Sequence, residues 1–261
     1  MKSKTERVEK FEELKKIVSG HDLQFHSSDS ELVLFSNIQP DKAEAKSPVI
    51  DWILDNTANT MLNLNEKDKP LIFIFGSAYK PGGGILSGAR AQEEDISLHS
   101  SFYFQVKDNE FYKMKHKDYT YSDYGVYVKN GLALTDLEYR ELPEFKKISF
   151  VSLAAPNLSA FLNNKVKFEE NELYQKYEDR LRSLFIFAES RGHKEIVVGP
   201  WGCGVFGLSP EKTSLIFNKI INENHYSGKI IFSIMNNEMF EIYKANISLN
   251  IDNKNVVKHK F

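Results

Sequence analysis

Residues 70–84 read P-L-I-F-I-F-G-S-A-Y-K-P-G-G-G. The apolar run at residues 70–75 is not interrupted by a polar residue, which predicts a strand buried on both faces, as in a parallel sheet. Three consecutive glycines lose much chain entropy on folding and are tolerated mainly where the backbone turns sharply or approaches a ligand closely. The stretch therefore predicts a buried strand that opens directly into a ligand-binding loop.

The segments on either side of this strand alternate between strand and helix patterns. Apolar spacing predicts strands at residues 31–38, around 124–129, 147–153, 195–198 and 229–235, and helices at residues 5–18, 48–62, 93–104, 171–191 and 210–224, with a last helix from Glu238. Such alternation predicts an α/β fold in which helices cover both faces of a largely parallel sheet. Open sheets of this kind bind ligands in the loops beyond the carboxyl ends of their strands.

Composition limits the classes of protein to which the chain can belong. Of 261 residues, 41% are hydrophobic and 13% aromatic, and no repeat or Pro/Gly/Ser linker divides them, so one large core is expected. The formal net charge of −2 gives no field that would attract a polyanion to the whole protein. A single cysteine, Cys203, excludes an intrachain disulfide. With no signal-peptide pattern and no apolar stretch long enough for a membrane span, a cytoplasmic location is predicted.

A second glycine-rich loop, G-P-W-G-C-G-V-F-G, occupies residues 199–207. It follows a predicted strand and precedes a predicted helix, so its amides and the helix N-terminus suit an anion. Neither loop has the spacing of a P-loop or of a dinucleotide-binding fingerprint. Cys203 has neither nucleophile-elbow spacing nor a recognisable partner base, so packing in a tight loop is favoured over nucleophilic catalysis.

Acidic residues follow the first glycine loop, at Glu93, Glu94 and Asp95. One interpretation is a helix first turn, where carboxylates interact favourably with the helix dipole. Their position after a glycine triplet favours a site with one carboxylate transferring protons, since adjacent residues do not point the same way. A pair flanking a bond from opposite sides, as in most glycosidases, is disfavoured. No metal site is predicted, because His21 and His26, the two histidines closest in sequence, lack metal-ligand spacing.

Three segments together resemble a known family. They are S-A-Y-K-P-G-G-G-I-L-S-G-A-R-A-Q-E-E at residues 77–94, V-S-L-A-A-P-N-L at 151–158, and V-V-G-P-W-G-C-G-V-F at 197–206. In this order they resemble the microbial type of poly(ADP-ribose) glycohydrolase, a branch of the macrodomain fold, over about residues 31–243. The resemblance implies a three-layer α/β/α sandwich with a mixed, largely parallel sheet. Residues 1–20 are then a helical extension and residues 21–261 the catalytic domain.

The resemblance also implies roles for individual residues. Glu94 is the catalytic acid and base, and Glu93 holds ribose hydroxyls. The other residues implied to contact the ligand are Gln92 beside them, Gly82, Gly83 and Gly84 against the distal ribose and diphosphate, Gly202, Cys203, Gly204 and Val205 around the diphosphate, and Phe206 on the ribose. No metal and no redox or other cofactor is expected.

The implied activity is hydrolysis of the O-glycosidic bond at C1″ of ADP-ribose, in poly(ADP-ribose) or in mono-ADP-ribosylated targets. Two alternatives stay open: a non-catalytic ADP-ribose reader, and a hydrolase of another ADP-ribose derivative, ADP-ribosylated nucleic acid included. The expected partners are therefore ADP-ribose and ADP-ribosylated proteins, with nucleic acid only as a modified substrate and no membrane. The sequence leaves the oligomeric state open.

Overall fold

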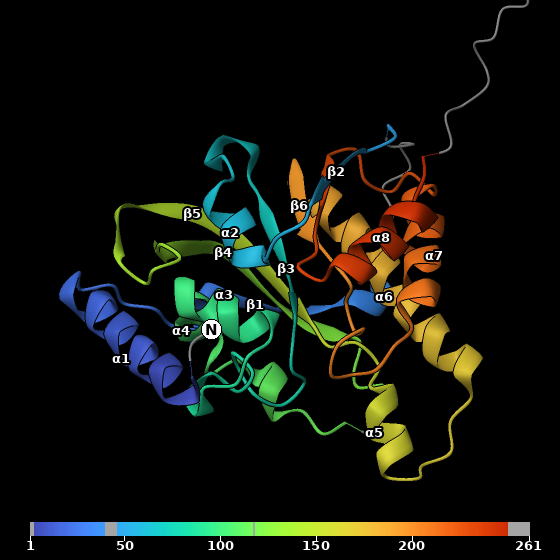
Figure 1. Cartoon of the computed structure of the whole chain (residues 1–261), viewed down its shortest axis with the longest axis horizontal. Helices are drawn as coiled ribbons and strands as arrows, with labels where there is room; N and C mark the ends of the chain where they lie inside the picture. The colour runs from blue at the N-terminus through green and yellow to red at the C-terminus, as the bar shows by residue number, and fades with distance from the viewer. Residues whose placement is uncertain (1–2, 40–45, 117, 250–261) are drawn as a thin grey trace, which may run out of the picture.

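In the computed structural model, which describes residues 3–39, 46–116 and 118–249, seven strands form one sheet between two sets of helices (Figure 1). The strands are β1 (Ser30–Leu34), β2 (Val49–Ile53), β3 (Leu71–Phe75), β4 (Tyr124–Thr135), β5 (Glu141–Leu153), β6 (Glu195–Val198) and β7 (Lys229–Ser233). The α-helices are α1 (Lys4–Gly20), α2 (Thr57–Leu62), α3 (Gln92–His99), α4 (Phe102–Val106), α5 (Leu158–Asn163), α6 (Glu170–Ser190), α7 (Pro210–Ile221) and α8 (Asn237–Asn246). Short 3-10 helices are η1 (Ser27–Asp29), η2 (Phe35–Asn37), η3 (Glu66–Asp68), η4 (Ile85–Ser87) and η5 (Glu110–Lys113).

The sheet is mixed but mostly parallel. Its strand order is β1-β4-β5-β3-β6-β7-β2, with antiparallel pairs β1–β4 and β4–β5 at one end and parallel pairs from β5 to β2. Parallel neighbours need crossover connections, which here carry helices that cover the two faces of the sheet. The predicted α/β/α sandwich with a mixed, largely parallel sheet is confirmed. Among the described residues, no helix is both long enough and apolar enough to cross a membrane.

Strand β3 lies at the centre of this sheet, and its first four side chains are fully buried. Leu71 and Phe73 pack into a core shared with α6, α7 and α8. Ile72 and Ile74 point to the other face, where α2, α3 and α4 form a second core. Because side chains alternate along a strand, only a continuous apolar run fills both cores. The buried strand predicted from residues 70–75 is therefore confirmed.

The helix predicted at residues 48–62 is wrong in its first half. Residues Val49 to Ile53 instead form β2, which pairs in parallel with β7 at the edge of the sheet. The helix α2 begins only after Asn56, whose side chain caps its first turn. The β-branched residues Val49, Ile50 and Ile53 suit a strand, and the open edge of β7 supplies a partner that local spacing does not reveal.

The helix predicted at residues 93–104 is also wrong, because it is broken into α3 and α4. At the break, Ser100 adopts an extended conformation and forms a bridge with Ala133 of β4. The amide of Ser101 donates to the carbonyl of Leu132 at 2.8 Å. A contact with a distant strand thus interrupts the helix after two turns.

The strands predicted at residues 124–129 and 147–153 are parts of a longer antiparallel hairpin formed by β4 and β5. Its turn is closed by Asp136, whose carboxylate accepts the amides of Glu138 and Arg140, both at 2.9 Å. The other predicted elements agree with α1, β1, α6, β6, α7, β7 and α8 apart from shifts at their ends, whereas the apolar spacing does not predict α5.

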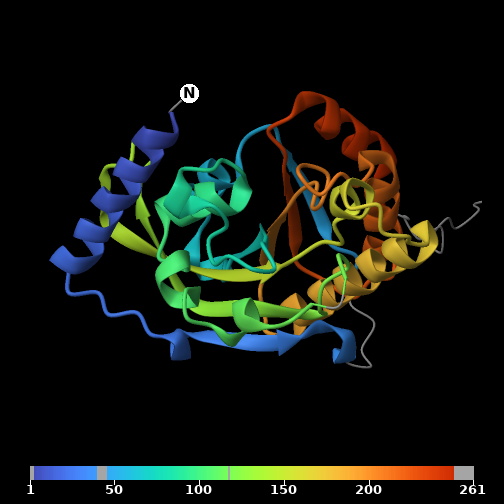
Figure 2. The same ribbon diagram turned by 90° about the horizontal axis from the view of Figure 1, so that it is seen from below.

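Helix α1 packs against the loop that leads into α3 (Figure 2). Phe11 and Leu14 are buried against Ile85 of that loop. The guanidinium of Arg7, only 4% exposed, donates from Nε to the carbonyl of Ala89 at 3.1 Å and lies 3.4 Å from the Asp95 carboxylate. Through these contacts α1 supports the segment that carries Glu93, Glu94 and Asp95. The domain boundary at residue 20, between a helical extension and a catalytic domain, stays a prediction.

Arg7→Met is expected to destabilise the protein by about 1–3 kcal/mol, because it removes a buried donor and leaves Asp95 without its cation. The measurement is urea unfolding of the native protein and the variant. Arg140→Met is the matched control, since Arg140 is exposed and its ion pairs with Asp136 and Glu138 lie in solvent. Equal midpoints for Arg7→Met and the native protein would contradict the anchoring role of α1.

Candidate functional site

The two glycine-rich loops meet at one edge of the sheet. The first follows β3 and the second follows β6, and these strands are parallel neighbours. They pair only through Leu71 with Ile196 and Ile72 with Val197, so β3 continues without β6 beyond this point. The carboxyl ends of adjacent parallel strands are where open α/β sheets bind ligands.

Gln92 occupies the position that β6 leaves open along β3. Its amide nitrogen donates to the carbonyl of Phe73 at 2.8 Å, and its amide oxygen accepts the N–H of Phe75 at 3.0 Å. These two bonds replace strand pairing and fix the start of α3 against the end of β3. Gln92 thus positions the two glutamates that follow it, and the implied ligand contact of Gln92 stays a prediction.

Glu93 and Glu94 are both buried, with exposures of 3% and 7%. Glu93 Oε2 accepts the N–H of Ser77 at 2.7 Å, and Glu94 Oε1 accepts the N–H of Gly84 at 2.6 Å. Each carboxylate therefore uses one oxygen to bind the first glycine loop. The second oxygen of each, Glu93 Oε1 and Glu94 Oε2, is buried with no hydrogen-bond partner in the described part of the chain. Buried polar atoms rarely lack a partner, so the two free oxygens are a candidate place for the donor groups of a ligand.

The pKa of Glu93 is raised well above its ordinary value. Burial is the largest cause because it penalises the charged carboxylate, and the nearby charge of Glu94 acts in the same direction. The amides of Ser77, Gly83 and Gly82 oppose these effects by stabilising the carboxylate. Glu93 therefore keeps its proton to higher pH than an exposed glutamate does.

The glycine triplet allows this close contact. Gly82 and Gly83 have φ angles of +65° and +63°, in the left-handed region that disfavours other residues. A Cβ atom on Gly83 would lie 2.4 Å from Glu94 Oε1 and 3.2 Å from Glu93 Oε2. The backbone therefore approaches the carboxylates so closely that no side chain fits between them.

In the second loop the cysteine thiol packs inside the protein. Cys203 is buried, and its Sγ lies 3.1 Å from Thr213 Oγ1 and 3.6 Å from the Tyr243 hydroxyl. Burial raises the pKa of this thiol, which disfavours the thiolate that a nucleophile needs. The exposed residues of the loop are Gly204, Val205 and Gly207, of which Val205 is 79% exposed. The packing role predicted for the Cys203 side chain agrees with these contacts.

Aromatic side chains connect the two loops. The Tyr121 ring lies 6.0 Å from Phe206 of the second loop and 5.7 Å from Tyr79 of the first. His116 packs on Tyr79, and its Nε2 donates to the carbonyl of Ala78 at 3.1 Å while Nδ1 accepts the amide of Ser122. The sequence does not predict this cluster, because residues 116–122 carry no periodic signal. The positive φ of Tyr121, +62°, shows only in the folded chain.

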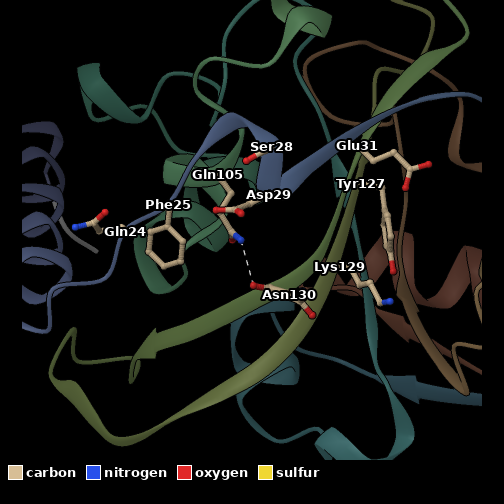
Figure 3. Close-up of a pocket in the computed structure, with 9 residues that line it drawn as sticks. All are labelled: Gln24, Phe25, Ser28, Asp29, Glu31, Gln105, Tyr127, Lys129 and Asn130. Atoms are coloured by element: carbon tan, nitrogen blue, oxygen red, sulfur yellow. Dashed lines mark hydrogen bonds between the residues drawn. The ribbon is translucent and has the colours of Figure 1, made fainter.

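A cavity of about 450 Å³ opens elsewhere, beside β1 and β4 (Figure 3). Its lining residues are Gln24, Phe25, Ser28, Asp29, Glu31, Gln105, Tyr127, Lys129 and Asn130. The dashed line in Figure 3 is the bond from the Gln105 amide to the carbonyl of Asn130, at 3.1 Å. None of the predicted site residues lines this cavity. The described residues contain no group of three or more His, Cys, Asp or Glu placed to hold a metal ion.

The chain is similar to known proteins in sequence and in fold. Residues 5–133 match the sequence model of the family described as microbial-type PARG, catalytic domain, where PARG stands for poly(ADP-ribose) glycohydrolase. The crystal structure of the PARG of Thermomonospora curvata is 22% identical and similar in fold over 93% of this chain and 100% of that chain, with a TM-score of 0.81. The same enzyme bound to the inhibitor ADP-HPD gives a TM-score of 0.77 at the same identity and coverage.

A PARG from Deinococcus radiodurans in complex with ADP-ribose is 19% identical, over 84% of this chain and 94% of that chain, with a TM-score of 0.73. No curated protein sequence gives a significant match. At these identities the structural likeness concerns the fold, and the family match concerns the half of the chain that contains the glutamate pair.

Proposed function

This chain belongs, over residues 5–133, to the family of microbial-type poly(ADP-ribose) glycohydrolases, which are glycosidases, and on this premise we propose that it releases ADP-ribose by hydrolysing the O-glycosidic bond at C1″. Its targets are poly(ADP-ribose) or proteins that carry a single ADP-ribose. The observation that supports this most strongly is the buried pair of carboxyl groups, each bonded once to the glycine loop and each with one free oxygen.

Glu94 is assigned the proton transfers. As the bond between C1″ and the leaving oxygen breaks, the Glu94 carboxyl group donates its proton to that oxygen, and the ribose carbon gains oxocarbenium character. Glu94 then accepts a proton from the water whose oxygen bonds to C1″. Because Glu93 directly precedes Glu94 on the same helix turn and binds the same loop, the pair supports one acid and base, not two opposed carboxylates.

We assign to Glu93 the binding of the ribose hydroxyls. Its free Oε1 is a buried acceptor with no donor among the residues that the structure describes, and hydroxyl groups of a bound sugar are suitable donors. Holding the ribose by its hydroxyls fixes C1″ relative to Glu94, and such positioning contributes strongly to rate. The glycine triplet beside both carboxylates supports close approach of the sugar and diphosphate.

The second glycine loop is assigned to the diphosphate, and Gly204→Ala tests this. A Cβ on Gly204 meets no atom within 4 Å, so the variant is expected to keep the native stability. If the diphosphate lies against this backbone, the added methyl group displaces it, and affinity for ADP-ribose falls by about 10-fold or more. Titration calorimetry measures the affinity and thermal unfolding measures the stability.

Gly20→Ala is the control, because Gly20 also has open space around it and lies at the end of α1. Gly20→Ala is expected to change neither the affinity for ADP-ribose nor the thermal stability. Native affinity in Gly204→Ala would show that the loop does not approach the ligand.

The activity itself is tested with two substrates, poly(ADP-ribose) and a mono-ADP-ribosylated protein, by measuring free ADP-ribose released by the native protein. Release from the polymer that stops at the last unit supports polymer glycohydrolase activity. Release from the mono-modified protein alone indicates the same chemistry on a different target. Tight binding without release from either substrate would contradict the enzyme assignment and favour a reader of ADP-ribose.

A further inference from the structure

Arg180, in the middle of α6, is a cation shut inside the protein, with only 2% of its side chain exposed. Its Nε donates to the Asp123 carboxylate at 2.9 Å, and its Nη1 donates to the carbonyl of Ala154, just after β5, at 3.1 Å. Its Nη2 donates to the carbonyl of Tyr121 at 3.1 Å. A buried cation costs much free energy unless its donors are paired. The planar guanidinium meets this condition by bonding in three directions at once.

The segment that Arg180 holds, residues 119–123, is also held from the other side by Asn157. The side-chain amide of Asn157 donates to the Tyr121 hydroxyl at 3.0 Å, and its backbone N–H donates to the carbonyl of Tyr119 at 2.8 Å. Arg180 binds the backbone of Tyr121 while Asn157 binds its side chain. Both ends of this one residue are therefore fixed by the fold.

The ring of Tyr121 lies between the two glycine-rich loops. It is 5.7 Å from the ring of Tyr79 in the first loop and 6.0 Å from that of Phe206 in the second. Tyrosine rarely adopts a φ of +62°, and such a conformation persists only where surrounding contacts impose it. Because Nη2 of Arg180 binds the carbonyl of this same residue, the guanidinium acts directly on the strained backbone.

We propose that Arg180 is a positioning residue for the ligand, which acts by fixing the ring of Tyr121 where it contacts ADP-ribose bound between the loops. This inference rests on the proposed function, since it takes ADP-ribose as the ligand. Tyr121 is half-buried, so part of its ring is open to contact, and aromatic faces stack on the planar bases of nucleotides. The bonds of Arg180 go to Asp123 and to backbone carbonyls, away from the glutamate pair, so its role concerns binding and not proton transfer.

Arg180→Lys tests the role, because lysine keeps the charge beside Asp123 but lacks the fork that reaches the two carbonyls. Affinity for ADP-ribose, measured by calorimetry, is expected to fall about 10-fold. KM for release of ADP-ribose rises accordingly, while kcat stays close to native. Arg182→Lys is the matched control, since Arg182 lies on the same helix but pairs with Glu178 and Glu223 instead. It is expected to leave affinity within about 2-fold of native.

A double substitution separates positioning from general support of the fold. Tyr121→Asn removes the ring, and asparagine adopts a positive φ more readily than most residues, so the backbone conformation is kept. Tyr121→Asn alone is expected to lower ADP-ribose affinity about 10-fold. In this background Arg180→Lys is expected to lower the unfolding temperature as before but to reduce affinity no further. A further fall in affinity in the double variant would overturn the assignment of Tyr121 as the residue through which Arg180 acts.

Asp123→Asn is the second variant and decides the matter should Arg180→Lys not fold. Asparagine keeps an oxygen that accepts Nε of Arg180 but loses the charge, and charge-assisted hydrogen bonds are about twice as strong as neutral ones. The expected fall in ADP-ribose affinity is about 3-fold, again with kcat close to native. Native affinity in Asp123→Asn would then contradict the positioning role.

Hydrogen exchange without ligand distinguishes a failure of this inference from a failure of the proposed function. Arg180→Lys is expected to speed exchange of the Asn157 amide, which is bonded to the Tyr119 carbonyl, at least about 10-fold. Exchange in β6 and β7 is expected to stay native, and Arg182→Lys to change none of these rates. Native exchange at Asn157 would overturn the positioning role, whether or not the protein hydrolyses ADP-ribose. Faster exchange in a protein that does not bind ADP-ribose would contradict the proposed function, and with it the ligand contact of Tyr121.

Discussion

Glu94→Gln is expected to release ADP-ribose at least about 100-fold more slowly than the native protein, while it binds ADP-ribose with similar affinity. Glutamine keeps the shape of the side chain and an oxygen that can accept the Gly84 amide, so the glycine loop stays in place. It cannot donate a proton to the leaving oxygen or accept one from water. The measurement compares the rate of release with affinity from calorimetry.

Glu93→Gln is the matched comparison, since it changes the neighbouring carboxyl group in the same way. Its main expected effect is weaker binding, because Glu93 is assigned to the ribose and not to the proton transfers. Full activity in Glu94→Gln would remove the assignment of Glu94 as acid and base. Equal losses of rate in both variants would instead indicate that the pair transfers protons as a unit.

Gly83→Ala is expected to lose activity by about 100-fold. The added Cβ would lie 2.4 Å from Glu94 Oε1, so the carboxylate or the loop must move. Displacing a catalytic group by about 1 Å can reduce the rate by this amount. Alanine also adopts a φ of +63° only with strain, which lowers stability by about 1–2 kcal/mol.

The control for strain is Gly192→Ala. Gly192 has a φ of +71° but open space around it, so alanine there brings the same backbone strain without a contact. Its expected result is a similar loss of stability with the native rate of release. If Gly83→Ala were as active as Gly192→Ala, the close approach of the loop to Glu94 would not matter for catalysis.

Much of the fold follows from patterns within short segments. The apolar run of β3 fills two cores, and the regular spacing of α6 and α7 marks their buried faces. Helix and strand patterns failed where a partner distant in sequence decided the conformation. Edge pairing with β7 made residues Val49 to Ile53 a strand, and contact with β4 at Ser100 divided the predicted helix into α3 and α4.

The features of the candidate site are likewise of two kinds: those that the sequence indicates and those that only the folded chain shows. The sequence by itself indicated the glycine triplet and the glutamates, because adjacent glycines and a Q-E-E turn are unusual within one loop. Only the tertiary structure decided which oxygens are held and which are free, that Gln92 completes the edge of β3, and that Arg7 anchors the loop before α3. These contacts join residues from separate elements, and their geometry exists only once the strands are in register and the cores are packed.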